Sequence, residues 1–203
     1  MGLNNIGFYF ITDSKITKKP ITQQVKEALA ADVKIIQYRE KTKKKQAMIK
    51  ELKKIKKLAK GKALLIVNDY LTLAKYADGV HLGQDESKLK KAREKIKDRI
   101  LGITVHNYEE AKEAITLGAD YLAVSPVFIS KTKLDAGKPI SITEIEKIKT
   151  LKIPLVAIGG ITLKNVDIVL KMGIKNIVAI SDVLKSRSIA KRIRQYQKKI
   201  ILS

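Results

Sequence analysis

One short polar stretch gives the sequence its clearest chemical signal. Gln37, Arg39 and Lys41 alternate along the chain directly after the apolar residues 33–36, so their side chains point the same way while the backbone stays extended. Arginine presents a planar fork of donors, lysine a point charge, and glutamine a neutral hydrogen-bonding group. Together they suit a polyanion such as a pyrophosphate. An exposed edge in a lysine-rich chain would have the same composition, so other strand ends must decide.

Carboxylates follow two further apolar runs. Asn68 and Asp69 come after residues 63–67, and Asp85 and Glu86 come shortly after residues 79–82. Hard carboxylate oxygens beside a pyrophosphate suit Mg²⁺, which often bridges protein and phosphates through few protein ligands. The structural alternatives are a helix N-cap at Asp69 and first-turn acids at Asp85 and Glu86. With no cysteine and only two histidines in the chain, we do not expect a zinc site.

The two histidines and a glycine pair also follow or interrupt apolar runs. His81 lies inside the apolar run at residues 79–82, where we expect a packed histidine. His106 lies at the end of the run that contains Thr104 and is an open candidate for function. Gly159 and Gly160 follow residues 155–158, where backbone N–H groups at a helix N-terminus could bind a phosphate. A tight turn that needs glycine for its dihedral angles would give the same pair.

Short apolar runs alternating with amphipathic segments must position these groups. The predicted strands are residues 8–11, 33–37, 63–67, 79–82, 100–105, 121–124, 155–158 and 176–180. The predicted helices are residues 21–31, 43–60, 71–76, 89–96, 109–117, 142–148, 163–171 and 186–198. Continuous apolar strands indicate burial on both faces, as in a parallel sheet with crossover helices. We therefore expect a single (β/α)8 barrel domain over residues 1–203, with a doubly wound open sheet as the alternative.

In a (β/α)8 barrel the chemistry lies at the carboxyl ends of the strands, which meet on one rim. Most of the polar groups above fall at such ends. The long polar loop at residues 125–140 fits a lid or binding loop. Two anion sites, a metal and a basic loop indicate phosphorylated substrates and displacement of a pyrophosphate, helped by positioning and charge.

Composition sets limits on partners. The net charge of +22 could indicate nucleic acid, but the lysines fill positions between regularly spaced apolar residues, as on solvated helix faces, and aromatic–basic interleaving is missing. We therefore expect small-molecule substrates and no nucleic-acid partner. No apolar run is long enough for a membrane span and no signal peptide is present, so we expect a cytoplasmic protein. A homo-oligomer is compatible with the sequence.

The same residues resemble the thiamine phosphate synthase (thiamine-phosphate pyrophosphorylase) family over nearly the whole chain. The stretches that carry the resemblance are residues 9–13, 37–41, 68–69, 79–84, 102–106, 126–128 with 132–133, 158–161 and 179–182. The resemblance implies a (β/α)8 barrel that joins hydroxymethylpyrimidine pyrophosphate to a thiazole phosphate. Pyrophosphate would depart first with the help of Mg²⁺, and the thiazole nitrogen would capture the resulting pyrimidine methylene cation. A closing loop would keep water away from that cation.

Site roles follow from the resemblance, position by position. It implies that the pyrimidine pyrophosphate is held by Gln37, Arg39, Lys41 and Asn68. Asp69 would bind Mg²⁺, with Glu86 or Asp85 as the second ligand. Thr104 and Lys133 would contact the departing pyrophosphate, and the catalytic groups would be Arg39, Lys41, Thr104 and Lys133. The thiazole phosphate would be held by Ser130, Thr132 and the backbone of Gly160, Ile180 and Ser181.

The chain departs from the family pattern at three places. Glu86 stands where the family usually has aspartate, which leaves the second metal ligand open between Glu86 and Asp85. Thr104 replaces a common serine and keeps its hydroxyl, and Ile129-Ser130 replaces the usual Pro-Thr of the loop. The alternatives are a thiazole tautomerase-like homologue with His106 as its catalytic candidate, a basic nucleic-acid-binding barrel, and a non-catalytic phosphate-binding barrel.

Overall fold

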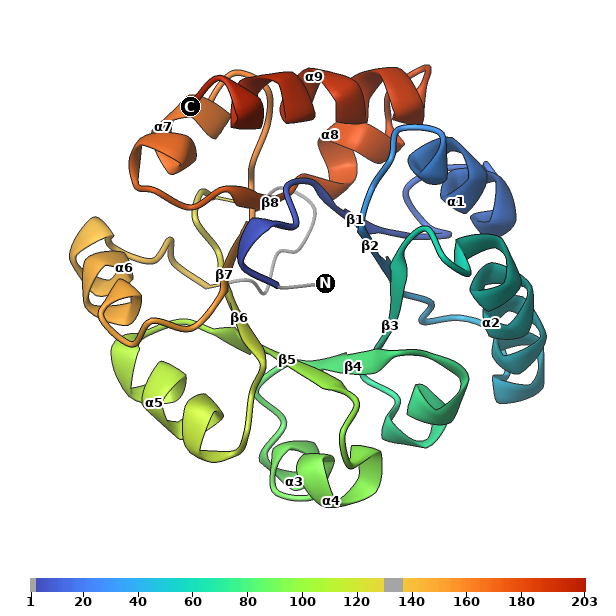
Figure 1. Cartoon of the computed structure of the whole chain (residues 1–203), viewed down its shortest axis with the longest axis horizontal. Helices are drawn as coiled ribbons and strands as arrows, with labels where there is room; N and C mark the ends of the chain where they lie inside the picture. Colours follow the sequence, from blue (N-terminus) through green and yellow to red (C-terminus); the bar gives the residue numbers. More distant parts are fainter. Residues whose placement is uncertain (1–2, 130–136) are drawn as a thin grey trace.

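A computed structural model describes residues 3–129 and 137–203 of the chain. Its eight strands form one parallel sheet in which every strand pairs with the next in sequence. The strands are β1 (Tyr9–Ile11), β2 (Ile35–Tyr38), β3 (Leu64–Asn68), β4 (Gly79–Leu82), β5 (Ile100–Val105), β6 (Tyr121–Val124), β7 (Leu155–Ile158) and β8 (Asn176–Val178). They surround a central axis in Figure 1.

Helices form the outer ring. The 3₁₀ helices are η1 (Leu3–Asn5) and η2 (Leu71–Tyr76). The α-helices are α1 (Ile21–Leu29), α2 (Lys45–Ala59), α3 (Glu86–Leu89), α4 (Ala92–Ile96), α5 (Tyr108–Thr116), α6 (Ile142–Lys149), α7 (Val166–Lys171), α8 (Ile180–Leu184) and α9 (Ile189–Ile201). This arrangement is the (β/α)8 barrel, so the predicted fold is confirmed and the doubly wound alternative is wrong.

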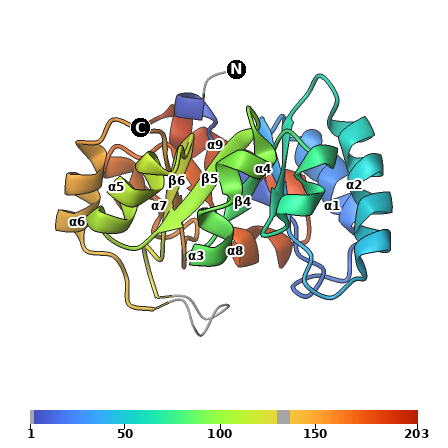
Figure 2. The ribbon, with the colours of Figure 1, turned by 90° about the horizontal axis from the view of Figure 1, so that it is seen from below.

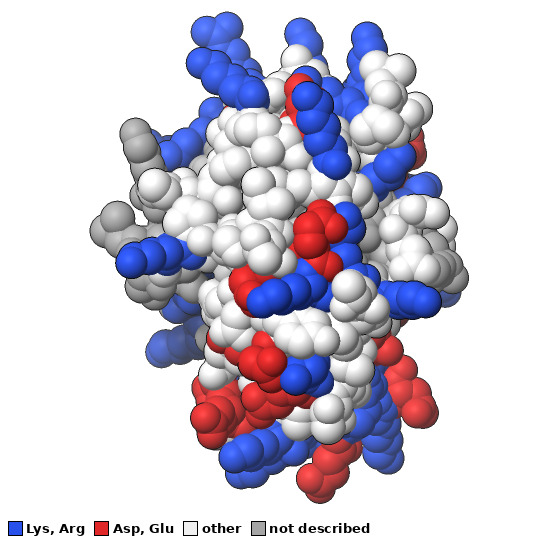
Figure 3. Space-filling view, turned by 90° about the vertical axis from the view of Figure 1, so that its left-hand side faces the viewer, with Lys and Arg blue, Asp and Glu red and all other residues white. Residues whose placement is uncertain are grey.

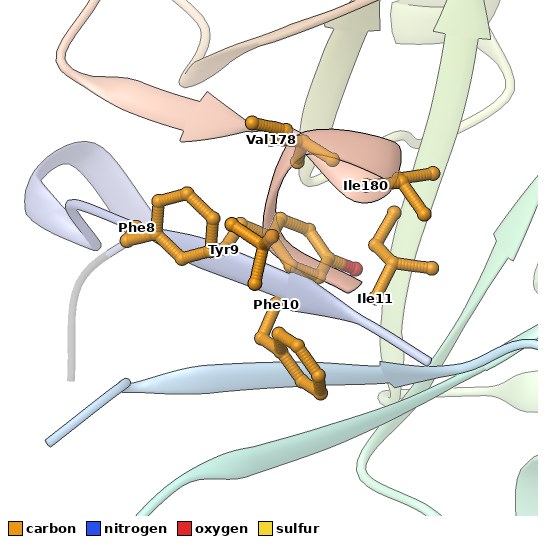
Figure 4. A pocket seen from close by; sticks show the side chains of 8 residues that line it. Phe8, Tyr9, Phe10, Ile11, Val178 and Ile180 are labelled. Carbon is orange, nitrogen blue, oxygen red and sulfur yellow. The ribbon is translucent and has the colours of Figure 1, made fainter. Parts of the chain in front are cut away.

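The sheet closes between its first and last strands. Phe8 forms a parallel bridge with Ile177, whose N–H donates to the Gly7 carbonyl at 3.0 Å. Side chains of β1, β8 and α8 fill the junction (Figure 4). The recess they leave is apolar and has no room for a water molecule. The closed sheet therefore brings β8 beside β1 and completes the rim on which the site is built.

The amino-terminal segment covers one end of the barrel. The buried Asn176 side chain accepts from the N–H groups of Ile6 and Gly7 and donates to the carbonyls of Leu3 and Leu155. Figure 2 shows η1 at this end and α3 and α8 at the other. The carboxyl-end rim thus stays uncovered by the amino-terminal segment.

The core has two layers, as alternation along barrel strands requires. The inner layer fills the barrel and consists of Ile6, Tyr9, Ile11, Ile35, Ile66, Tyr121, Ala123, Val156 and Val178. The outer layer packs strands against helices. In α2, for example, Met48, Leu52, Ile55 and Ala59 are buried at helical spacing while lysines face outward. Truncation of a residue such as Leu52 to alanine should cost about 2–5 kcal/mol of unfolding free energy.

Several predicted boundaries differ from the structure. The predicted helix at residues 89–96 is two short helices, α3 and α4. The predicted helix at residues 163–171 begins only at Val166. The predicted strand at residues 176–180 ends at Val178, and a helix that the sequence analysis missed, α8, begins at Ile180. A short apolar run has no periodicity that separates a strand from the start of a buried helix, so the missed change is understandable.

Charged side chains are spread over the surface. On the face shown in Figure 3, lysine and arginine side chains project from all parts, and acidic side chains lie among them mainly in the middle and lower parts of the view. The solvated-face interpretation of the lysines agrees with this pattern. Within the described residues, no helix is both long and apolar enough to cross a membrane.

Candidate active site

Parallel strands in one sheet end on the same edge, so the polar groups that follow them share one rim. Gln37 pairs in register with Ile66 of β3, and Asn68 pairs with His81 of β4. The structure therefore brings the ends of β2, β3 and β4 side by side, as predicted. Which ligands these residues bind stays a prediction.

Gln37 lies inside the barrel just below the rim. Its side chain is only 2% exposed, and its Nε2 donates to the Tyr9 hydroxyl at 3.0 Å. The Thr12 N–H donates to the Gln37 carbonyl, which extends the β1–β2 ladder by one step. A rigidly held amide at this depth can read a polar edge of a ligand that enters from the rim.

Arg39 is paired with an acid that the sequence analysis missed. Its guanidinium donates to the buried carboxylate of Asp13, which follows β1, and its N–H donates to the Thr12 hydroxyl at 3.1 Å. Asp13 is itself fixed by the Gln24 side chain, which accepts from the Asp13 N–H. Arginine has five N–H donors, so the pairing orients the fork and leaves donors for an anion. The available signal was that Asp13 follows a strand, as Arg39 does.

Lys41 is exposed and lies in a bend before α2 rather than directly at the helix start. The preceding residue, Glu40, is buried and accepts from both the N–H and the hydroxyl of Thr42 at 2.8 and 2.7 Å. Burial alone would raise the pKa of Glu40, but these hydrogen bonds and the Lys43 ammonium lower it to about 2. An ionised Glu40 thus anchors the bend that presents Lys41.

Asp69 sits in a left-handed backbone conformation with φ of 65°. Its N–H donates to the His81 carbonyl at 2.9 Å, and its carboxylate accepts from the Asn68 amide at 2.6 Å. The N-cap of η2 is Tyr70, without a side-chain cap, so the capping alternative for Asp69 is wrong. A strained position occupied by a carboxylate fits a functional group better than a structural one.

Asp85 and Glu86 differ in their attachments. Asp85 is the N-cap of α3, where it accepts from the N–H and hydroxyl of Ser87 and pairs with Lys88 at 3.1 Å. Hydrogen bonds from Ser87 and Lys88 lower the pKa of Asp85. Glu86 is the first residue of α3 and is exposed, and its carboxylate lies 3.5 Å from the Lys90 ammonium. The alternative of a first-turn acid therefore holds for Glu86, whereas Asp85 is the N-cap one residue earlier, and Glu86 is the freer carboxylate.

Thr104 is tied to a buried histidine. His81 Nε2 lies 2.8 Å from the Thr104 hydroxyl, and His81 Nδ1 lies 3.0 Å from the Tyr121 hydroxyl. Burial lowers the pKa of His81 to about 4, against an opposing effect of the Asp69 charge. His81 is thus a neutral, packed histidine, as expected. The contact that it makes with Thr104 was not foreseen.

His106 is held away from such contacts. Its Nδ1 lies 2.8 Å from a Glu110 carboxylate oxygen, which also accepts from the His106 N–H. Its side chain is 40% exposed at the start of α5. The contact with Glu110 fits a side chain that is engaged at the start of a helix.

The β7 end carries the glycine pair. Both glycines have positive φ, 106° at Gly159 and 63° at Gly160. A Cβ at Gly160 would lie 2.6 Å from the Ile129 carbonyl oxygen, and one at Gly159 would lie 2.6 Å from Pro126. The turn therefore requires glycine for both dihedral angles and packing, as its structural alternative proposed. That requirement leaves open whether the turn also binds phosphate.

Ile180 and Ser181 begin α8 beside this turn. The first N–H groups of a helix have no acceptor within it, and Ile180 and Ser181 are the first two residues of α8, whose N-cap residue Ala179 provides no side-chain cap. Three predicted site residues, Ser130, Thr132 and Lys133, lie outside the described residues. Among the described residues, no cluster of three or more carboxylate or histidine groups could hold a metal.

Comparisons with known proteins agree on one family. The profile of the family described as thiamine monophosphate synthase matches residues 8–183. The thiamine-phosphate synthase of Methanosarcina mazei is 42% identical over 198 residues, covering 96% of this chain and 82% of the relative. That of Methanosarcina barkeri is 39% identical, covering 96% and 90%. The solved thiamine phosphate pyrophosphorylase of Pyrococcus furiosus superposes with a TM-score of 0.89 at 35% identity, covering 98% of both chains.

Proposed function

Because the chain belongs to the thiamine monophosphate synthase family, and is thus a transferase of thiamine biosynthesis, we propose how its rim carries out the reaction. Hydroxymethylpyrimidine pyrophosphate binds at the ends of β2 to β5, and hydroxyethylthiazole phosphate binds at the ends of β6 to β8. The products are thiamine phosphate and pyrophosphate. One barrel domain over residues 1–203 carries both subsites.

The observation that best supports this assignment is the clustering of groups at adjacent strand ends. Gln37 and Arg39 lie at the end of β2, and Asn68 and Asp69 at the end of β3. Gln37 binds the pyrimidine, and Arg39, Lys41 and Asn68 bind its pyrophosphate. The geometry suits an anion because Arg39 is oriented by Asp13 and keeps donors free.

The donor set fits Mg²⁺, which needs only one or two protein carboxylates when phosphates and water supply its other ligands. Asp69 is the first ligand because its carboxylate caps no helix and its backbone is held by His81. Glu86 is the second ligand, since Asp85 is already bound to Ser87 and Lys88. When bound, the ion neutralises charge on the departing pyrophosphate.

The side chains carry the rest of the reaction. Pyrophosphate leaves the pyrimidine methylene carbon with its bonding electrons, while Arg39, Lys41, Thr104 and Lys133 stabilise the charge it gains. The thiazole nitrogen then donates its lone pair to the methylene cation, which forms the new carbon–nitrogen bond. Backbone N–H groups at Gly160, Ile180 and Ser181, with Ser130 and Thr132, hold the thiazole phosphate so that its ring nitrogen faces that carbon.

Pyrophosphate release by the purified protein tests the proposal. The protein is given the pyrimidine pyrophosphate with and without the thiazole phosphate, in Mg²⁺ and in EDTA. We expect release only with both substrates and Mg²⁺, with thiamine phosphate as the product. Absence of release in every condition would overturn the proposal and turn attention to the tautomerase and binding-only alternatives.

Matched carboxylate variants test the metal ligands. Asp69→Asn and Glu86→Gln should raise the Mg²⁺ concentration needed for half-maximal activity by about tenfold or more. Asp85→Asn is the control, because asparagine keeps the N-cap while removing the charge. If Asp85→Asn rather than Glu86→Gln shifts the Mg²⁺ requirement, Asp85 is the second ligand.

The high net charge has a separate test. We propose that it serves the attraction of small anionic substrates rather than nucleic acid. Filter binding of RNA and DNA at moderate salt should retain nothing. Retention that falls steeply with added salt would instead favour a nucleic-acid partner.

A further inference from the structure

A chain of hydrogen bonds crosses the barrel interior from the pyrimidine side to the pyrophosphate side. Gln37 Nε2 donates to the Tyr9 hydroxyl at 3.0 Å, and the Tyr9 and Tyr121 hydroxyls lie 2.8 Å apart. The Tyr121 hydroxyl lies 3.0 Å from His81 Nδ1, and His81 Nε2 lies 2.8 Å from the Thr104 hydroxyl. The five residues come from five different strands, β2, β1, β6, β4 and β5.

The interior members hold their protons. Tyr9 and Tyr121 are 1% and 0% exposed, and burial raises the pKa of each phenol well above its ordinary value. His81 is 7% exposed and its ring lies between two uncharged hydroxyls, those of Tyr121 and Thr104, an environment that favours the neutral imidazole. At neutral pH the chain therefore consists of two protonated phenols and a neutral imidazole, with one proton on each member.

Proton counting gives the chain a direction. An amide nitrogen only donates, so the Tyr9 hydroxyl accepts from Gln37. The Tyr9 hydroxyl must then donate its own hydrogen to Tyr121, because this buried hydrogen has no other acceptor within the hydrogen-bond chain. Tyr121 then donates to His81 Nδ1, and the remaining His81 proton, on Nε2, donates to Thr104. The Thr104 hydroxyl has accepted a hydrogen bond, and its own hydrogen is free to point at the rim.

The barrel makes a specific place for the middle of this chain. A Cβ at Gly102 on β5 would lie 2.1 Å from the Tyr121 ring, so only glycine leaves room for that ring. The His81 and Tyr121 rings stack with centroids 5.6 Å apart and an interplanar angle of 26°. The Gln84 side chain donates to the Thr104 carbonyl and fixes the last member. These contacts hold the centre of the hydrogen-bond chain and its Thr104 end in place.

We propose that Tyr9, Tyr121 and His81 are positioning residues that turn the Thr104 hydroxyl hydrogen toward the departing pyrophosphate. They act through Thr104 and touch no substrate themselves. The hydrogen-bond chain begins at the Gln37 amide. The residue that we propose binds the pyrimidine therefore also orients the Thr104 hydroxyl, which donates to the leaving group. The inference rests on the proposed function for its ligand, but the direction of the chain is a property of the protein alone.

The histidine tautomer tests that direction without any substrate. The protein has two histidines, so ¹⁵N-histidine labelling with a His106→Gln variant for assignment isolates His81. We expect a neutral imidazole protonated on Nε2. Protonation on Nδ1 would mean that the chain runs from Thr104 toward Gln37, with oxygen lone pairs facing the anion, and would overturn the proposal.

A double-mutant cycle tests the functional consequence. Tyr121→Phe removes the hydroxyl that links Tyr9 to His81 while keeping the ring. It should lower kcat for pyrophosphate release about tenfold and leave KM for both substrates within about twofold of the wild-type values. Thr104→Ala should remove the same effect, so the double variant should be no slower than Thr104→Ala alone. Additive losses, or an unchanged kcat in Tyr121→Phe, would overturn the proposal.

A second buried tyrosine supplies the control. Tyr196 is 0% exposed and donates to Asp182 at 2.8 Å, outside the barrel interior. Tyr196→Phe also removes a buried hydroxyl and should lower thermal stability without the tenfold change in kcat. If wild-type protein releases no pyrophosphate, the proposed function fails, while the tautomer measurement still decides whether the chain has the direction inferred.

Discussion

The two sides of the rim differ in the groups that we propose bind anions. At the ends of β2 to β5 these groups are side chains, and two of them contact a neighbouring residue that orients them: Asp13 holds Arg39, and His81 contacts Thr104. The side at β7 and β8 offers backbone N–H groups, which the path of the chain orients through the turn at Gly160. The first side should therefore be sensitive to lost functional groups and their partners, and the second to changes in backbone geometry.

Loss of the Arg39 fork should have the largest effect. Arg39→Ala removes a preorganised donor set from the charge that develops on the leaving group, and should lower kcat by roughly 10²–10³-fold. Steady-state pyrophosphate release measures this. Arg39→Lys is the matched variant, because it keeps the charge that pairs with Asp13 but loses the planar fork. Full activity in Arg39→Lys would mean that charge alone matters on this side.

Acid should weaken the fold through His81. Its pKa is about 4 in the folded protein against an ordinary 6.5, so the unfolded chain binds more protons in between. Unfolding free energy should thus fall as pH drops from 6.5 to 4, with His81 contributing on the order of 3 kcal/mol. Urea unfolding at several pH values measures the slope.

The matched variant for this slope is His81→Gln, which cannot titrate. Subtracting its pH dependence from that of the wild type removes the contribution of the carboxylates. If the difference in unfolding free energy between the two proteins stays constant between pH 6.5 and 4, His81 is not a buried neutral imidazole. The proposed contact that orients Thr104 would then lose its basis.

Backbone geometry should decide the other side. Gly160→Ala places a Cβ 2.6 Å from the Ile129 carbonyl at a positive φ, and should lower the unfolding free energy by about 1–3 kcal/mol. It should also raise KM for the thiazole phosphate more than KM for the pyrimidine pyrophosphate. Gly61→Ala is the control, since Gly61 has φ of 72° with open space around it. If both variants lose the same unfolding free energy, the effect comes from the positive φ alone and not from the clash at Gly160.

His106 should show the smallest effect. Its Nδ1 lies 2.8 Å from a Glu110 carboxylate oxygen, so the ring is already engaged, and His106→Gln should change kcat/KM less than about twofold. A loss of tenfold or more would revive the tautomerase-like alternative, in which His106 is the catalytic candidate.

Residue patterns alone were enough to predict the fold class and the strand ends at which polar side chains gather. Eight apolar runs alternating with amphipathic segments require parallel strands with crossover helices. Because the carboxyl ends of these strands lie on one rim, Gln37, Arg39, Asp69 and Thr104 are predicted to lie near one another. Such side chains can be predicted because the residue type alone gives their charge and hydrogen-bonding groups.

The end of β8 at Val178 and the polar contacts inside the barrel became visible only in three dimensions. The change from β8 to α8 at Ile180 carries no periodic signal, since four apolar residues fit either element. Tyr9 and Tyr121 are 112 positions apart in sequence yet share a hydrogen bond. Closure of the sheet turns both side chains inward, and contacts between residues so distant cannot be read from local patterns. The interior polar chain follows from that closure.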